Sequence, residues 1–104
     1  MINDLLKLIN SNDKDLKKIA SNKTTLQIVL LLYKCEIEKK NIMSADKFIE
    51  ENEIDASRSK KIAIIQNLER DNIIKRETNI DDKRSKKIYL NKNIKEKLKK
   101  YLEN

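Results

Sequence analysis

The stretch LERDNIIKRETNIDDKRSKKIYL, residues 68–90, decides the fold that the sequence predicts. It begins with the end of a helical pattern and continues with Ile73 and Ile74, a polar run, and then Ile88 and Leu90. Apolar residues in alternation on both sides of a polar segment are typical of two paired strands that bury one face. We therefore expect a helix followed by a β-hairpin with a solvated tip.

The predicted tip, residues 78–84, and the start of the second strand are basic. They contain Lys83, Arg84, Lys86 and Lys87. Positive charge on a projecting hairpin suits a phosphate backbone or a narrow minor groove. We expect Lys83, Lys86 and Lys87 to contact phosphates. An alternative for Lys86 and Lys87 is that they protect an edge strand against aggregation.

A helix-turn-helix unit precedes the hairpin. Ser44 is a natural N-cap for a helix over residues 45–51, and after a short turn Asp55 or Ser57 caps a second helix that runs to about Asp71. The second helix has an apolar side at helical spacing, and its other side is small and hydrogen-bonding. The residues of that other side are Ser59, Lys60, Ala63, Gln66, Asn67 and Arg70.

The residue types on this second side match the chemistry of base recognition. Gln66 and Asn67 can each form a bidentate pair of hydrogen bonds with adenine, and Lys60 and Arg70 can do so with guanine. Ala63 can contact a thymine methyl group. The alternative is an ordinary solvated helix face. Because a basic hairpin follows this helix, we interpret it as a DNA-recognition helix.

The same segment resembles the MarR-type winged helix-turn-helix proteins. In that family the recognition helix ends in Leu-Glu-x-x-Gly and two hydrophobic residues, and the wing contains Asp-x-Arg before a hydrophobic strand. Here LERDNII fills residues 68–74, and Asp82, Lys83 and Arg84 form the second motif. Asn72 stands where the family has Gly, and Asn is the next most permissive residue at a left-handed helix C-cap.

The resemblance covers roughly the last two-thirds of the chain. It implies a wing in which Asp82 orients Arg84 and Arg84 reaches into the minor groove. It also implies a dimer, although family members have longer terminal helices around an effector pocket. With about 22 residues before the core and about 14 after it, we do not expect a large pocket here.

The rest of the chain predicts further helices. Apolar spacing indicates helices over residues 2–9 and 13–20, Thr24 with Gln27 suggests a capping box for a central helix over residues 26–39, and Asn91 caps a last helix. The predicted fold class is mainly α with a small β-hairpin, a winged helix-turn-helix. We expect one domain over residues 1–104, with a helical extension (1–22), a winged helix core (23–90) and a C-terminal helix (91–104).

The charge is unevenly distributed along the chain. The 104 residues include 24 Lys and Arg and 17 Asp and Glu, a net charge of +7, and the whole excess lies in residues 55–104. This is the half that contains the predicted recognition helix and wing. Such asymmetry is expected of a nucleic-acid-binding protein.

Composition argues against several other classes of protein. There is no His and no Gly, which excludes a Gly-rich phosphate loop and His-dependent catalytic or zinc sites, so we expect no enzyme, no cofactor and no metal. The single Cys35 cannot form an internal disulfide, and we expect it to be a small core residue. No apolar run is long enough for a membrane span, and we expect a cytoplasmic protein without a signal peptide.

The function that the sequence predicts is sequence-specific binding of double-stranded DNA by a homodimer, most simply a transcriptional regulator. The alternative is an accessory DNA-binding protein of a plasmid or phage, at a transfer origin, partition site or similar element, with a protein partner at the DNA site. A winged helix that binds RNA or protein is a third class. Apolar residues at the two termini predict the dimer contact. These are Ile2, Leu5, Leu6, Ile9, Leu98, Tyr101 and Leu102.

Overall fold

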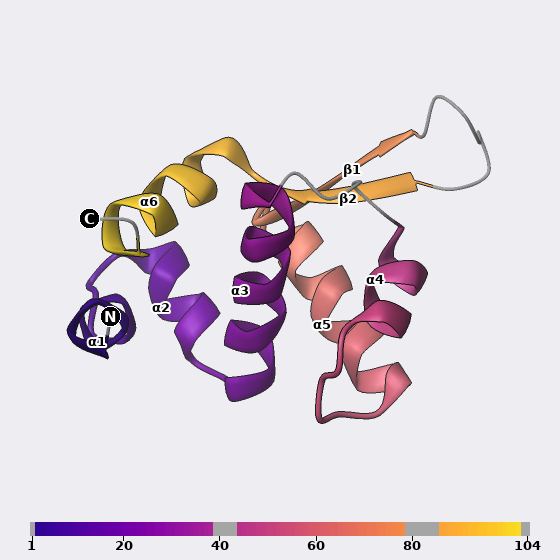
Figure 1. Ribbon diagram of the computed structural model, residues 1–104, viewed down its shortest axis with the longest axis horizontal. Helices are drawn as coiled ribbons and strands as arrows, with labels where there is room; N and C mark the ends of the chain where they lie inside the picture. Colours follow the sequence, from indigo (N-terminus) through magenta and orange to yellow (C-terminus); the bar gives the residue numbers. More distant parts are fainter. Residues whose placement is uncertain (1, 39–43, 79–85, 103–104) are drawn as a thin grey trace.

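The computed structural model describes residues 2–38, 44–78 and 86–102 (Figure 1). The described chain is mainly α-helical with one small antiparallel hairpin, as the sequence predicts. Its elements are, in order, α1 (Ile2–Ile9), α2 (Lys14–Ala20), α3 (Lys23–Ile37), α4 (Ala45–Glu51), α5 (Arg58–Arg70), β1 (Ile74–Thr78), β2 (Lys86–Leu90) and α6 (Lys92–Leu102).

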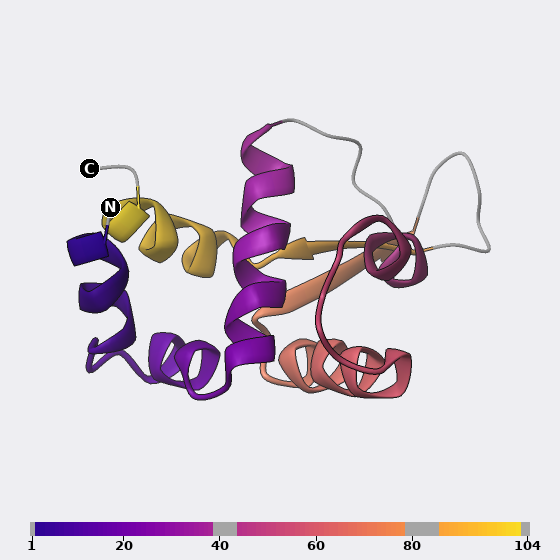
Figure 2. The same ribbon diagram turned by 60° about the horizontal axis from the view of Figure 1, so that its bottom comes forward.

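Helix α3 stands in the middle of the molecule. Figures 1 and 2 both show α1, α2 and α6 on one side of it and α4, α5 and the hairpin on the other. Its contacts with α2, α5 and β2 explain why apolar residues occupy much of its circumference. Buried side chains from every helix and from both strands form one cluster around it, and Phe48 and Ile28 are among those fully buried.

The start of α3 differs from the sequence prediction. The N-cap is Asn22, whose side-chain Oδ1 accepts the backbone N–H groups of Thr24 and Thr25 at 2.8 and 3.2 Å. The predicted capping box of Thr24 with Gln27 is therefore wrong. Asn is at least as good an N-cap as Thr, and Thr24 lies buried in the first turn.

Helices α4 and α5 begin at predicted caps, and for α5 the structure selects Ser57 over Asp55. Ser44 caps α4 by accepting the Lys47 N–H, and Ser57 caps α5 by accepting the Lys60 N–H. An exposed ion pair between Arg58 and Asp46, 2.8 Å long, joins the starts of the two helices.

The hairpin pairs β1 with β2 from Ile74 opposite Leu90 to Thr78 opposite Lys86. Thr78 thus belongs to the first strand and not to the predicted tip, and residues 79–85 lie outside the described residues. On its other side β2 has a bridge from Lys87 to Ser44. Because β2 has a partner on both sides at this point, Lys87 is not the guard of an open edge.

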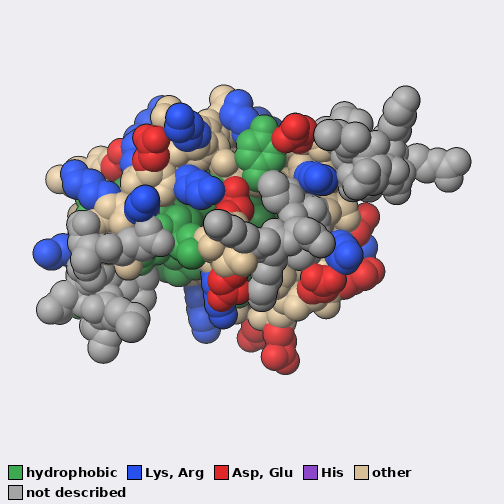
Figure 3. Space-filling view, turned by 45° about the horizontal axis from the view of Figure 1, so that its top comes forward, with side chains coloured by type: hydrophobic (Ala, Val, Ile, Leu, Met, Phe, Trp, Pro, Cys, Tyr) green, Lys and Arg blue, Asp and Glu red, His purple; other side chains and the backbone are tan. Residues whose placement is uncertain are grey.

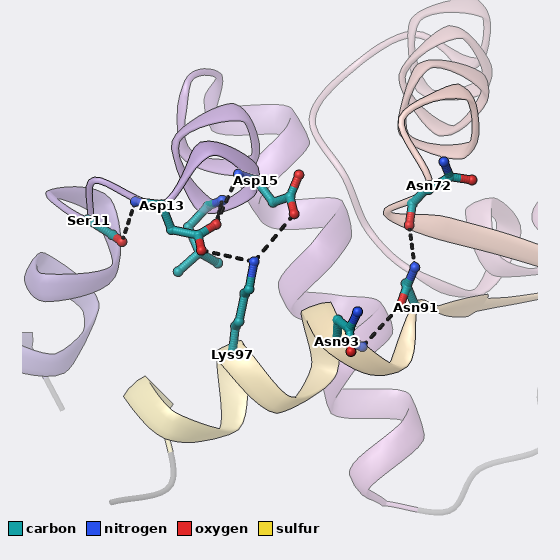
Figure 4. A network of polar contacts seen from close by, with 8 residues as sticks. Ser11, Asp13, Asp15, Asn72, Asn91, Asn93 and Lys97 are labelled. Carbon is teal, nitrogen blue, oxygen red and sulfur yellow. Dashed lines mark hydrogen bonds and ion pairs between the residues drawn. The ribbon is translucent and has the colours of Figure 1, made fainter.

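Helix α6 is tied to α2 by charge. Asn91 caps α6 as predicted, by accepting the Asn93 N–H. Further along α6, Lys97 Nζ lies 2.9 Å from Asp13 Oδ2 and 3.4 Å from Asp15 Oδ2 (Figure 4). Asp13 is also the N-cap of α2, because its Oδ1 accepts the N–H groups of Asp15 and Leu16.

A half-buried carboxylate joins α3 to the end of β2. The Leu90 backbone N–H donates to Glu36 Oε2 at 3.3 Å. Burial raises the pKa of Glu36, and the hydrogen bond from Leu90 and the charge of Lys95 partly offset this rise. The strand that leads into α6 is therefore held by α3 on one side and by β1 on the other.

The Asp13–Lys97 pair predicts a pH-dependent contribution to stability. The hydrogen bond from Lys97 holds the pKa of Asp13 below its usual value of 3.8, and the same contact raises the pKa of Lys97 above 10.5. The stabilisation is therefore present at neutral pH and is lost as the pH falls through the lowered pKa of Asp13. Asp13→Asn should keep the cap and reduce the unfolding free energy at pH 7 by less than about 1 kcal/mol, since the pair is solvent-screened.

Urea unfolding of the two proteins from neutral pH down to about pH 3 measures this difference. We expect the difference to disappear at the acid end, where Asp13 is protonated. An unchanged difference there would show that Asn caps α2 poorly and that the ion pair contributes nothing.

Candidate nucleic-acid interface

The exposed side of α5 is formed by the six residues that the sequence singled out. Ile65 and Leu68 are buried and Ile62 and Ile64 are partly buried, which fixes the side of α5 that faces the core. The opposite side spans about a third of the helix circumference at 100° per residue. All of its members are exposed: Ser59, Lys60, Ala63, Gln66, Asn67 and Arg70.

These side chains are not engaged elsewhere in the described part of the chain. No hydrogen bond or ion pair joins any of the six side chains to another described residue. Ala63 and Arg70 lie near the centre of the face, and Gln66 and Lys60 lie at its two margins. Asn67 also lines a hollow of about 160 Å³ with residues of α2 and α3.

The end of α5 is a sharp reversal built around Asn72. Its φ is 61°, the left-handed region, and a Schellman motif surrounds it: the Asn72 N–H donates to Glu69 O and the Ile73 N–H to Leu68 O. The Asn72 carbonyl accepts Asn91 Nδ2 at 2.9 Å (Figure 4). This junction joins α5 to the hairpin through residues 71–73 alone.

A second link between α5 and the hairpin was not predicted from the sequence. Arg76 Nε lies 2.7 Å from Glu69 Oε1, and each side chain is about one-third exposed. Arg76 is opposite Ile88 in the register, so it lies on the face of the hairpin that packs against α5. The sequence signal was available in the two-residue alternation from Ile74 to Arg76.

The hairpin separates the two lysines that were expected to act alike. Lys86 is exposed and has the same strand parity as Ile88 and Leu90, so it lies on the core-facing side of the hairpin, at the start of β2 next to the start of α4. Lys87 is partly buried and has the opposite parity, so it lies on the outer side. The other predicted wing residues, Asp82, Lys83 and Arg84, lie outside the described residues.

A polar hollow of about 410 Å³ lies between α2, the end of α5 and α6 (Figure 4). Its charged groups already compensate one another, because Lys97 holds Asp15 and Lys18 lies 2.6 Å from Asp71. The charges that line this hollow therefore do not indicate one class of ligand. Over the residues that the structure describes, no group of three or more His, Cys, Asp or Glu side chains is placed to hold a metal ion.

Comparison of the chain with protein-family models, with curated proteins and with solved structures finds no match. Among the described residues, no helix is both long and apolar enough to cross a membrane.

The reversal at Asn72 predicts how stable two variants at this position should be relative to the parent protein. Asn72→Ala should reduce the unfolding free energy by about 1 kcal/mol, because a β-carbon without a polar partner is disfavoured in the left-handed region. Asn72→Gly should be close to neutral, since relief of strain offsets the greater freedom of the unfolded chain. The contact with Asn91 uses the Asn72 carbonyl and is retained in both variants.

Thermal and urea unfolding of the three proteins measure the order. If the Ala variant is as stable as the parent protein, the left-handed junction is not a constraint on the fold.

Proposed function

We propose that the protein is a winged helix-turn-helix protein that binds double-stranded DNA in a sequence-specific manner. Helix α5 would enter the major groove, and the hairpin would act as the wing beside it. The observation that supports this most is the face of α5, where six small, amide or basic side chains are exposed together. They are of the types that read base edges. The proposal is of a binding protein and not of an enzyme.

The hairpin supports the same proposal by its position. It follows α5 directly, Arg76 pairs with Glu69 of α5, and Lys86 lies on the same core-facing side of the hairpin. A duplex that lies along α5 would therefore meet Lys86 as a phosphate contact. We extend the assignment to Lys83 and Arg84 by the motif alone, with Asp82 orienting Arg84.

The likeness to MarR-type proteins is supported by one structural detail. The family motif has Gly after the recognition helix, and this chain has Asn72 there with a positive φ. A left-handed residue at that point is what the Gly of the motif supplies. On this basis we propose a transcriptional regulator that acts by occupying its DNA site.

We further propose that the DNA-binding form is a homodimer. Leu6 and Ile9 are 50% and 40% exposed on α1, and Tyr101 and Leu102 are partly buried at the end of α6, which packs against α1. An amphipathic helix with exposed apolar side chains is suited to a two-fold contact. Leu98, which the sequence also suggested for this contact, is fully buried in the core of its own chain.

Selection of binding sites from a random duplex library tests the proposal. We expect a preferred sequence with two inverted half-sites about one helical turn of DNA apart, because a symmetric dimer presents two copies of α5. Gln66→Ala should cost on the order of 1–3 kcal/mol at the preferred site and little at random DNA. Arg70→Ala should also relax the preference at a base pair, whereas Lys86→Ala should weaken binding to all sequences and reduce the salt slope by about one unit, the value for one lost phosphate contact.

Lys23→Ala is the matched control, because Lys23 is exposed at the start of α3 and outside the proposed interface. It should bind like the parent protein. Selection that yields no preferred sequence, or a preference that the Gln66 and Arg70 variants leave unchanged, would contradict sequence reading by α5.

A further inference from the structure

The outer face of the hairpin, the face away from α5, combines an aromatic ring with lysines. Ile74, Ile88 and Leu90 are buried on the inner face. By strand alternation the outer face presents Lys75, Glu77, Lys87 and Tyr89. In the register Lys75 is directly opposite Tyr89, and Glu77 is directly opposite Lys87.

Tyr89 is not part of the core. It is partly buried, but it is absent from the partly buried hydrophobic residues that pack against the core cluster, whereas Tyr101 is among them and Tyr33 is within the cluster. Its ring therefore contributes little to the packing of the interior. An aromatic ring beside lysines on a sheet surface is the arrangement that stacks on unpaired bases.

The two lysines of the outer face, and the lysine at the start of α6 two residues after the end of β2, are not used in ion pairs with other described residues. Within the described residues, Lys75, Lys87 and Lys92, the first residue of α6, have no carboxylate within ion-pair distance. Five other described basic side chains do form ion pairs. The pairs are Lys18 with Asp71, Lys47 with Glu51, Arg58 with Asp46, Arg76 with Glu69, and Lys97 with Asp13 and Asp15.

This face points away from the proposed duplex site. Figure 1 shows α4 and α5 on one side of the hairpin and no described element over the other. Figure 3 views the molecule from this side, where lysine and arginine side chains lie over α6 and the hairpin with some carboxylates among them. A duplex held by α5 is separated from this face by the hairpin itself.

We propose that the outer face of the hairpin and the start of α6 form a second nucleic-acid site, specific for single strands. Tyr89 stacks on an unpaired base, and Lys75, Lys87 and Lys92 contact the phosphates on either side of it. A duplex keeps its bases stacked within the helix and cannot offer a face to the ring. The site goes beyond the proposed duplex binding and does not depend on it.

The test uses the full chain with a thymidine oligonucleotide of about twelve nucleotides, the matching uridine oligonucleotide and a blunt duplex. The chain has no Trp, so Tyr89→Trp introduces a single fluorescent reporter. We expect either single strand to quench its emission, because base stacking brings a nucleobase onto the ring. Tyr89→Ala should weaken single-strand binding about five- to a hundred-fold, and Tyr89→Phe should retain it.

Two further variants keep the test independent of folding defects. Glu77→Gln removes the one carboxylate among the outer-face residues and should tighten single-strand binding, a gain that damage to the fold cannot produce. Lys75→Ala should lower the salt slope by about 0.7 units, the value for one phosphate of a single strand. Lys23→Ala is again the control.

The results separate this site from the proposed function. Gln66→Ala should alter the preferred duplex sequence and leave single-strand binding intact. Tyr89→Ala should weaken single-strand binding and leave the preferred duplex sequence unchanged. The proposal is overturned if Tyr89→Ala binds the oligonucleotides like the parent protein, or if the Trp reporter is quenched by the duplex as strongly as by the single strands. Equal competition by polyglutamate and by the oligonucleotides would also overturn it, because such a surface binds any polyanion.

Discussion

The left-handed backbone of Asn72 is the constraint on which the arrangement of the candidate interface depends. A single Schellman motif around this residue ends α5, and β1 begins directly after it. The Ile73 carbonyl then accepts the Asn91 N–H, and the Asn72 carbonyl accepts Asn91 Nδ2. One reversal thus holds together the end of α5, the start of β1 and the start of α6. A change of backbone angle there would turn the hairpin relative to the exposed face of α5.

Because strands alternate, the junction gives the hairpin two chemically different faces. On the inner face Arg76 is paired with Glu69 of α5, and Lys86 continues beyond the core. On the outer face Tyr89 lies among lysines with no ion pair in the described structure. Part of the positive charge in the second half of the chain is therefore divided between these two faces. We propose that the first contributes to binding a duplex held by α5, and that the second binds an unpaired strand.

The sequence predicted those features that depend on neighbours along the chain. Ser44 and Asn91 were correctly identified as caps, and Ser57 was one of the two candidates for α5, because capping acts over two or three residues. The six exposed positions of α5 followed from its helical period. The cap of α3 was missed because Asn22 and Thr24 are both good candidates and only the burial of Thr24 decides between them.

Other features depend on contacts between residues far apart in sequence. Lys97 meets Asp13 across most of the chain, and Leu90 meets Glu36 across the core, so no local pattern could indicate either contact. Lys86 and Lys87 were grouped by charge, although strand parity already places them on opposite faces. Leu98 was assigned to a dimer contact, but it is buried in the core of its own chain. From the sequence alone, the apolar stripe of α6 that contains Leu98 could pack against either that core or a partner chain.

The central claim is that the exposed face of α5 and the inner side of the hairpin form one duplex-binding surface. The most direct test is to record backbone amide NMR shifts of the full chain during titration with its selected DNA duplex. The account predicts the largest changes along residues 59–70 and at Lys86, with small changes at Tyr89 and along α1. Changes concentrated on α1, α2 or the outer face of the hairpin, with α5 unaffected, would contradict it.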